Sequence, residues 1–262
     1  MNKKIFLVVL TVVTIFCIVF GTLHHIGISR KGYSSVASSI RNSFRHGKFN
    51  FHFYDYDDDD YDDDNEEFDF DSNDPKTFNS EAIGEFTELE VKLKVGGITI
   101  ERGSKWEIKT KYSKPYLKPS YTLRNGKLTV SQDGYNKKTT GNNNCIVIIT
   151  VPFGTELEKL SIDVNVGAVE LSGFDIVKGS IDTDVGAIEI SNVGFTNLEL
   201  DSDVGAVSIE LVEPLNNYNI NIDSDLGGIV VDGKNQKRRY SQKSSSDKRL
   251  RIDTNIGGIE VK

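Results

Sequence analysis

One hydrophobic pattern recurs six times between Leu89 and the end of this 262-residue chain. It is centred on a glycine, with apolar residues one and five positions before it and two and four positions after it. Apolar residues spaced two apart are typical of a strand with one buried face, and the spacing of three across the glycine predicts a sharp bend between two short strands. The anchor glycines are Gly96, Gly167, Gly186, Gly205, Gly227 and Gly257.

Glycine suits such a bend because it tolerates positive φ and lets another backbone pack close. From Gly167 onward the anchor glycines are 19, 19, 22 and 30 residues apart. A period of this length is typical of a solenoid, in which one turn is too small to bury its own face alone. We therefore predict an all-β, right-handed parallel β-helix or solenoid-like domain over residues 81–262, in which successive repeats stack. An antiparallel β meander or sandwich, with each Gly-Ala or Gly-Gly as a hairpin turn, is the alternative.

Three local features refine this domain. Asn125-Gly126 is a strong signal for a two-residue hairpin turn. The widened last interval contains residues 233–249, which a solenoid can accommodate as an exposed loop. Cys145 lies in an apolar run and is predicted to be a buried small hydrophobe, because two cysteines in such contexts indicate neither a disulfide nor a metal site.

The N-terminal region predicts attachment to a membrane. Residues 5–28 begin with sixteen residues no more polar than threonine and cysteine, and we expect an uncleaved transmembrane anchor preceded by a cytoplasmic stub at residues 1–4. Lys3 and Lys4 favour the N-terminus inside, although basic residues after the anchor oppose this orientation. The expected location is therefore the cell membrane, with a single pass and an extracytoplasmic C-terminal domain.

Residues 29–80 are expected to be a disordered linker. Within it, residues 55–74 hold 13 acidic residues and no basic ones; we call this segment the acidic tract. Blocks of like charge are usually solvated spacers, and this one would hold the domain clear of the bilayer. A divalent-cation sink is the other interpretation of the tract.

Outward positions four and two before the anchor glycines are mostly Asp or Asn. Parallel stacking predicts two ladders of these residues about 4.8 Å apart, in which like charges repel each other. One hypothesis is that Ca²⁺ relieves the repulsion; the other is that Asp and Asn mark strand ends and are screened by water. The candidate calcium ligands are Asp182, Asp184, Asp201, Asp203, Asp223 and Asp225; no other cofactor is expected.

A second candidate site is basic. Residues 234–251 hold eight basic residues and one acidic residue, which suggests contact with an anionic polymer or lipid headgroup. We expect no nucleic acid as partner, because Tyr240 is the only aromatic residue beside these charges and the domain is expected outside the cell. The candidate polyanion-binding residues are Lys237, Arg238, Arg239, Lys248 and Arg249.

No catalytic residue is predicted. All four histidines precede the repeats, so the repeat domain has no histidine-based triad and no His-ligated zinc. Paired carboxylates can cleave glycosides, which keeps an extracytoplasmic polysaccharide-processing enzyme as the alternative function. Regular repetition of the same acidic pair argues against it, since an active site is normally a break in a repeat.

Several segments together resemble the bacterial "putative adhesin" β-strand-repeat family of unknown function. They are FTELEVKLKVGGITIERG (residues 86–103), IVIITVPFGTELEKLSIDV (residues 146–164) and the serial [DN]-x-[DN]-[VIL]-G-[AG]-[IV] units. The resemblance covers residues from about 82 to 262 and implies a β-helix-like fold, an N-terminal membrane anchor and an envelope role, without established catalytic residues. We therefore expect a non-catalytic surface domain acting in cell-envelope adhesion, scaffolding or stress sensing, with envelope polymers or other membrane proteins as partners.

Overall fold

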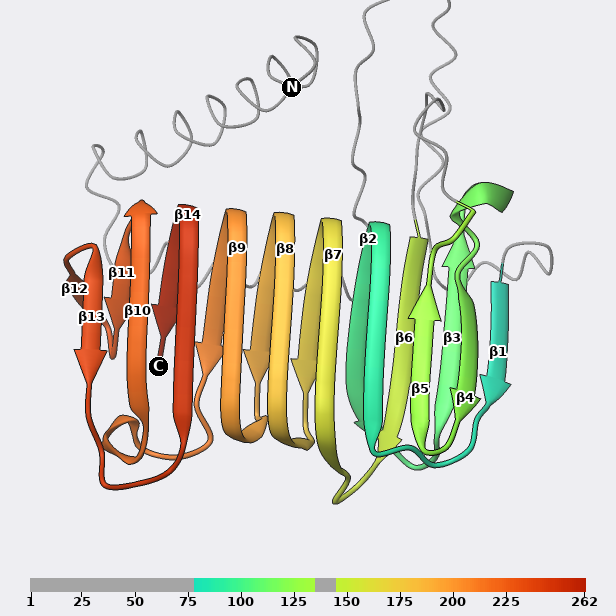
Figure 1. Cartoon of the computed structure of the whole chain (residues 1–262), viewed down its shortest axis with the longest axis horizontal. Coiled ribbons are helices and arrows are strands. Elements are labelled where there is room, and N and C mark those ends of the chain that lie inside the picture. The colour runs from blue at the N-terminus through green and yellow to red at the C-terminus, as the bar shows by residue number, and fades with distance from the viewer. Residues whose placement is uncertain (1–77, 135–144) are drawn as a thin grey trace, which may run out of the picture. The chain divides into compact units, whose positions relative to one another are not determined.

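A computed structural model describes residues 78–134 and 145–262, which form an all-β domain with two short 3₁₀ helices (Figure 1). The helices are η1 (Pro115–Leu117) and η2 (Leu215–Asn217). The strands are β1 (Phe78–Ala82), β2 (Glu88–Gly103), β3 (Glu107–Tyr112), β4 (Ser120–Arg124), β5 (Lys127–Ser131), β6 (Cys145–Pro152), β7 (Glu156–Ser172), β8 (Asp175–Ser191), β9 (Gly194–Glu210), β10 (Asn219–Leu226), β11 (Ile229–Val231), β12 (Lys234–Gln236), β13 (Arg239–Gln242) and β14 (Arg249–Val261).

Five long strands, β2, β7, β8, β9 and β14, each carry one complete repeat and pair in parallel. Each is one continuous strand that bends at its anchor glycine, with a first arm before the glycine and a second arm after it (Figure 1). Equivalent residues are in register, so that Ile162 pairs with Ile181 and Gly167 with Gly186. First arms therefore stack in one layer and second arms in another. This arrangement confirms the solenoid-like fold, and the antiparallel meander is wrong.

The stacking order departs from the sequence order at one point. Strand β14, which holds the last repeat, lies between β9 and β10. The repeat around Gly227 is displaced to the end of the stack, where it forms β10 and β11. The connections explain the exchange, because residues 192–193 alone join β8 to β9 whereas residues 211–218 join β9 to β10. The longer connection can pass one additional strand spacing of about 4.8 Å.

At the other end of the stack, β5 and β6 form a further turn that is divided. Strand β5 pairs in parallel with the first arm of β2, and β6 pairs in parallel with the second arm. The hairpin between β4 and β5 turns at Asn125 (φ 51°) and Gly126 (φ 73°), so the predicted hairpin is confirmed.

Residues 234–243, which we call the end cap, lie within the segment predicted as an exposed loop and form two strands instead. Strand β12 pairs antiparallel with β11, and β13 pairs antiparallel with β10. The β11–β12 hairpin turns at Asp232 (φ 50°) and Gly233 (φ 68°), and the ring of Tyr240 packs against the core. The insertion therefore continues both layers by one antiparallel strand each.

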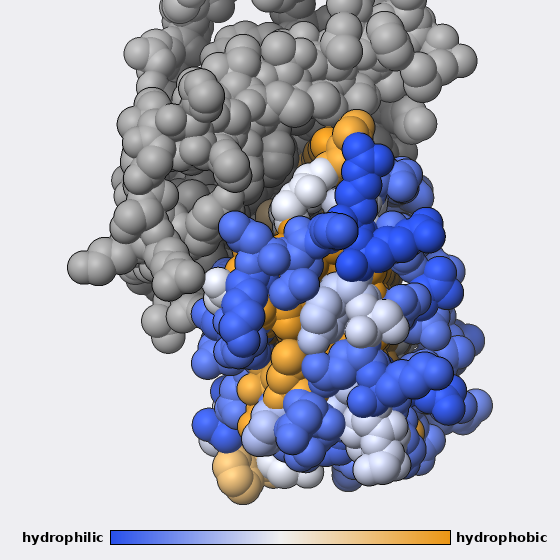
Figure 2. All heavy atoms as spheres, turned by 90° about the vertical axis from the view of Figure 1, so that its left-hand side faces the viewer, coloured by the Kyte–Doolittle hydropathy of each residue, from blue (hydrophilic) through white to orange (hydrophobic). Residues whose placement is uncertain are grey.

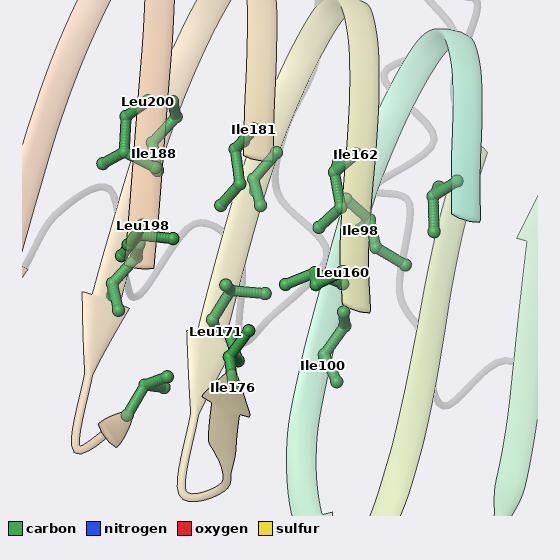
Figure 3. Packing of buried hydrophobic residues seen from close by; sticks show 14 of the residues in the cluster. Ile98, Ile100, Leu160, Ile162, Leu171, Ile176, Ile181, Ile188, Leu198 and Leu200 are labelled. Atoms are coloured by element: carbon green, nitrogen blue, oxygen red, sulfur yellow. The ribbon is translucent and has the colours of Figure 1, made fainter. Parts of the chain in front are cut away.

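The hydrophobic core lies between the two layers (Figure 3). Residues five before and two and four after the anchor glycine are at most 2% exposed in all six copies. The position directly before the glycine is different: Val166 is partly buried and Leu226 is 58% exposed. Except in the first copy, where Val95 is 3% exposed, this predicted core position lies at the rim of the core, beside the bend. Cys145 is fully buried as predicted, and its burial raises the pKa of the thiol to about 12.

Close stacking explains the anchor glycines. A Cβ on Gly186 would lie 1.7 Å from the carbonyl oxygen of Gly167, and a Cβ on Gly205 would lie 1.7 Å from that of Gly186. Neither Gly186 nor Gly205 has a positive φ. At Gly186 and Gly205 the close approach of another backbone is therefore the reason for glycine, whereas Gly96 has both a close approach and a positive φ of 142°.

Several expected segments lie outside the described residues. These are the cytoplasmic stub (residues 1–4), the transmembrane anchor (residues 5–28) and most of the linker (residues 29–80), including the acidic tract. Strand β1 begins at Phe78, inside the segment predicted as linker. Residues 78–134 and 145–262 contain no helix that is long and apolar enough to span a membrane.

Candidate binding face

The outer surface of the first arms presents the predicted Asp and Asn residues; we call it the ladder face. Successive side chains of a strand point to opposite faces. In β8, Asp182 and Asp184 are exposed on either side of Thr183, which is 1% exposed. The alternation around each anchor glycine therefore places the acidic positions outward on every repeat strand.

The residues four before the anchor glycines form one continuous row across the sheet. Each is the register partner of the next, which places five carboxylates about 4.8 Å apart. Each end of the row meets a basic residue in the same register. From one end to the other, the row reads Lys92, Asp163, Asp182, Asp201, Asp253, Asp223 and Arg239.

Basic side chains neutralise part of this row. Arg239 Nε lies 2.7 Å from Asp223 Oδ2, and Arg251 Nε donates a 2.7 Å hydrogen bond to Asp253 Oδ2. Asp182 and Asp201 form no ion pair with a described residue. Burial and then repulsion from neighbouring aspartates raise the pKa of both carboxyls above the ordinary value.

The residues two before the anchor glycines relieve their repulsion with amide groups. Lys94 Nζ donates to Asn165 Oδ1 (2.9 Å), and Asn165 Nδ2 donates to Asp184 Oδ2 (2.6 Å). Asn255 Nδ2 donates to Asp203 Oδ1 (2.7 Å). Arginine therefore relieves repulsion in the row four before the glycines, and lysine and asparagine relieve it in the row two before them. The interpretation that these residues mark strand ends is wrong for β7, β8, β9 and β14, where they lie within continuous strands; it holds only for Asp225, one residue before the end of β10.

We expect Asp201→Asn to stabilise the protein by about 0.5 kcal/mol at pH 7, because it removes like-charge repulsion on a solvated surface. With a pKa raised above 3.8, the folded state binds the Asp201 proton more tightly than the unfolded chain does. The Asp201 carboxylate therefore costs stability above that pKa, and the protein regains stability as the pH falls toward 3.8. In thermal unfolding, Asp201→Asn should have a higher Tm than the parent at pH 7. Between pH 7 and pH 4, its Tm should gain less than the Tm of the parent does. The exposed Asp247→Asn serves as the control, and a larger gain on acidification in Asp201→Asn would contradict the prediction.

A shallow depression of about 200 Å³ lies in the middle of the ladder face. Its groups can accept hydrogen bonds from hydroxyls and ammonium groups, and its guanidinium can donate to an anion. The polar residues that line it are Ser180, Asp182, Glu199, Asp201, Arg251 and Asp253.

The predicted calcium ligands occupy two separate rows of this face. Asp182, Asp201 and Asp223 belong to the row four before the glycines, and Asp184, Asp203 and Asp225 to the row two before them. Within residues 78–134 and 145–262, no three His, Cys, Asp or Glu side chains converge so that they could hold a metal ion. Calcium binding stays a prediction.

The predicted polyanion-binding residues fall into two groups. Lys237, Arg238 and Arg239 belong to the end cap. Lys248 lies before β14, where it pairs with Glu213 and stands 5.8 Å from the ring centroid of Tyr218. Arg249 begins β14. The five residues therefore do not form one patch.

Sequence reasoning missed a basic row on the ladder face. Eight positions before the anchor glycines, three of the six residues are basic and one end is acidic. In stacking order the row reads Glu88, Lys159, Lys178, Asn197, Arg249 and Asn219. This row runs parallel to the acidic row, so the face is striped with opposite charges. These residues recur with the period of the repeat, so the sequence does contain the signal, but they lie outside the apolar pattern that defines each copy.

Comparisons with known proteins agree with this architecture. A family model described as Toastrack DUF4097 matches residues 86–232 and, in an overlapping match, residues 153–262. The crystal structure of a "putative cell adhesion protein" from Clostridium sporogenes is similar with a TM-score of 0.54 and 19% sequence identity, over 70% of this chain and 97% of that chain. At this identity the likeness shows the fold alone.

Two further structures match with lower scores. One is a "putative adhesin" from Bacteroides fragilis (TM-score 0.32, 13% identity, 71% of this chain and 96% of that chain). The other is a "putative lipid binding protein" from Parabacteroides distasonis (TM-score 0.22, 9% identity, 71% and 96%). No curated protein matches the sequence.

Proposed function

Because the chain belongs to the Toastrack DUF4097 family, we propose that it is a membrane-anchored, non-catalytic binding module of the cell envelope, acting in adhesion, scaffolding or stress sensing. The observation that carries the proposal is the striped ladder face. Its rows repeat the same groups at a strand spacing of about 4.8 Å, so one linear polymer with repeating charged and hydroxylated units can contact several repeats at once. Many weak contacts of this kind add up to a strong one through multivalency.

Two observations support binding rather than turnover. The depression on the ladder face is shallow, whereas ligand pockets that perform chemistry are usually concave and bury most of the substrate. The name of the Clostridium sporogenes structure, a "putative cell adhesion protein", also agrees with an adhesive role. The partners under this proposal are envelope polymers or other membrane proteins, and the membrane itself through residues 5–28.

Binding to isolated envelope polysaccharide tests the proposal. The full chain should co-sediment with the polymer, and the double variant Asp182→Asn/Asp201→Asn should bind at least tenfold more weakly because the middle of the acidic row is neutralised. Glu158→Asn/Glu210→Asn is the matched control, since it removes two exposed carboxylates outside the row and should bind normally. Equal binding by both variants would contradict the role of the ladder face, and release of sugar fragments that the double variant loses would favour the polysaccharide-processing alternative.

Protease treatment of intact cells tests the proposed location. An extracytoplasmic domain joined to the membrane through residues 29–80 should be cut without lysis. Protection of the domain until the cells are lysed would contradict surface adhesion.

A further inference from the structure

The end cap carries five exposed basic residues and no acidic one. Two have acidic partners, since Arg239 pairs with Asp223 and Lys234 Nζ lies 3.7 Å from Asp232. The other three form no ion pair with any residue in the described part of the chain. They are Lys237, Arg238 and Lys243.

The cap is also the last pair of strands at its end of the stack. Within the described residues, β12 pairs only with β11, and β13 pairs only with β10. Their outer backbone edges can therefore accept an extended segment, which is how exposed strand edges recruit other chains. Figure 2 looks onto this end, where hydrophilic residues surround an apolar strip. The surface combines cationic groups, free backbone edges and apolar contact area.

The chain itself contains a segment of complementary charge. The acidic tract, with 13 acidic and no basic residues, ends at residue 74, three residues before β1. Strand β1 is the last strand at the opposite end of the stacking order from the cap. The tract is therefore joined to the domain at the end of the stack opposite the cap.

Chain length favours contact between copies over contact within one copy. Nine strand spacings separate β1 from β12 in the stacking order, which is about 43 Å. Eighteen residues join Asp60, in the densest part of the tract, to Phe78; such a segment spans about 23 Å as a flexible chain. Reaching its own cap would therefore stretch the segment to roughly twice this span, which costs conformational entropy. When the β1 end of one copy faces the cap of the next, no such extension is needed.

We propose that the end cap binds the acidic tract of a second copy, so that copies associate head to tail. The contact is heterologous, because cap and tract are different surfaces, and each added copy offers a new cap and a new tract. The attraction is mainly between the free cationic groups and the acidic side chains, so it weakens as salt screens them.

Sedimentation velocity of the full chain in detergent micelles tests the proposal. At about 0.05 M salt we expect dimers and larger species whose proportion rises with concentration, and at about 0.5 M salt we expect monomers. The triple variant Lys237→Glu/Arg238→Glu/Lys243→Glu should be monomeric at both. The triple variant Lys114→Glu/Lys118→Glu/Arg124→Glu is the matched control, since these residues are exposed, lie outside the cap and belong to none of the rows of the ladder face, and it should associate like the parent.

A mixing experiment identifies the partner surface. A tract variant with asparagine at Asp57–Asp60 and Asp62–Asp64 should be monomeric alone. Mixed with the cap variant, it should form one-to-one dimers and nothing larger, because one protein supplies only the cap and the other only the tract. A mixture that stays monomeric would overturn the proposal, as would a parent chain that is monomeric at low salt, even if its cap bound an added anionic polymer.

Discussion

Gly186→Ala is expected to destabilise the domain by about 3 kcal/mol or more. The added Cβ would lie 1.7 Å from the carbonyl oxygen of Gly167 and 2.8 Å from its carbonyl carbon. Both contacts are with backbone, which cannot move aside without disturbing the parallel pairing of β7 with β8 over the whole repeat. Chemical denaturation followed by far-ultraviolet circular dichroism measures the loss as a lower midpoint.

Gly228→Ala is the matched control for this substitution. Gly228 directly follows an anchor glycine, and a Cβ there would have no atom within 4 Å. Three other copies already carry alanine at this position, namely Ala168, Ala187 and Ala206. The control should therefore change stability by less than about 0.5 kcal/mol. If both variants unfolded at the same denaturant concentration, close stacking would not be the reason for the anchor glycines.

The repeat pattern predicted the parallel stack because it records which side chains are buried. An apolar residue five before each anchor glycine, and two more after it, can share one core only if the copies lie in register. The pattern does not record the order of copies. The repeats in β9 and β14 match each other as well as neighbours in sequence do, so only the connection at residues 211–218 and the strand pairing of the end cap place β14 beside β9.

The burial of side chains at the rim and in the interior of the bend was harder to predict from the sequence. An apolar side chain before the anchor glycine looks like a core residue in sequence, yet Leu226 is exposed because β10 is close to the end of the stack. Conversely, the inward position three before the glycine is polar in several copies. Thr183 donates a 3.0 Å hydrogen bond to Ser202, whereas no described residue offers a partner to the hydroxyls of Ser224 and Thr254. Alternation predicts which way these side chains point, but residue type alone suggests the surface.

The residues of the candidate site could be predicted from the sequence, but the side chains that surround them could not. The Asp positions followed from the period of the repeat, and their row follows from parallel stacking. Their basic partners did not follow from it. Arg239 belongs to residues 233–249, which were predicted as an exposed loop, and Arg251 lies just before the apolar pattern of the last copy. The charge balance of the ladder face therefore depends in part on residues that the apolar pattern does not describe.

Gln132 is a further residue that no sequence pattern marks, and its replacement by leucine is expected to cost about 3–5 kcal/mol. Its side chain is 5% exposed and makes four hydrogen bonds to backbone. Its Oε1 accepts from the amides of Lys94 (2.8 Å) and Val95 (3.0 Å), and its Nε2 donates to the carbonyls of Val95 and Leu117 (both 3.0 Å). These groups lie where β2 approaches its bend, in a stretch with which neither β5 nor β6 pairs. The side-chain amide of Gln132 therefore makes the hydrogen bonds that a neighbouring strand would otherwise make. Leucine would leave several buried polar groups without partners, and each costs about 1–3 kcal/mol.

Gln236→Leu separates this effect from the general effect of replacing glutamine. Gln236 belongs to β12, and its side chain makes one 3.4 Å hydrogen bond, to the carbonyl of Lys234 two residues away. Its loss should cost less than about 0.5 kcal/mol in the same denaturation experiment. The loss in Gln132→Leu should come with faster amide hydrogen exchange at Lys94 and Val95, because the acceptor of both amides is removed. Unchanged exchange at these two amides would show that Gln132 does not hold the bend of β2, even if the variant were less stable.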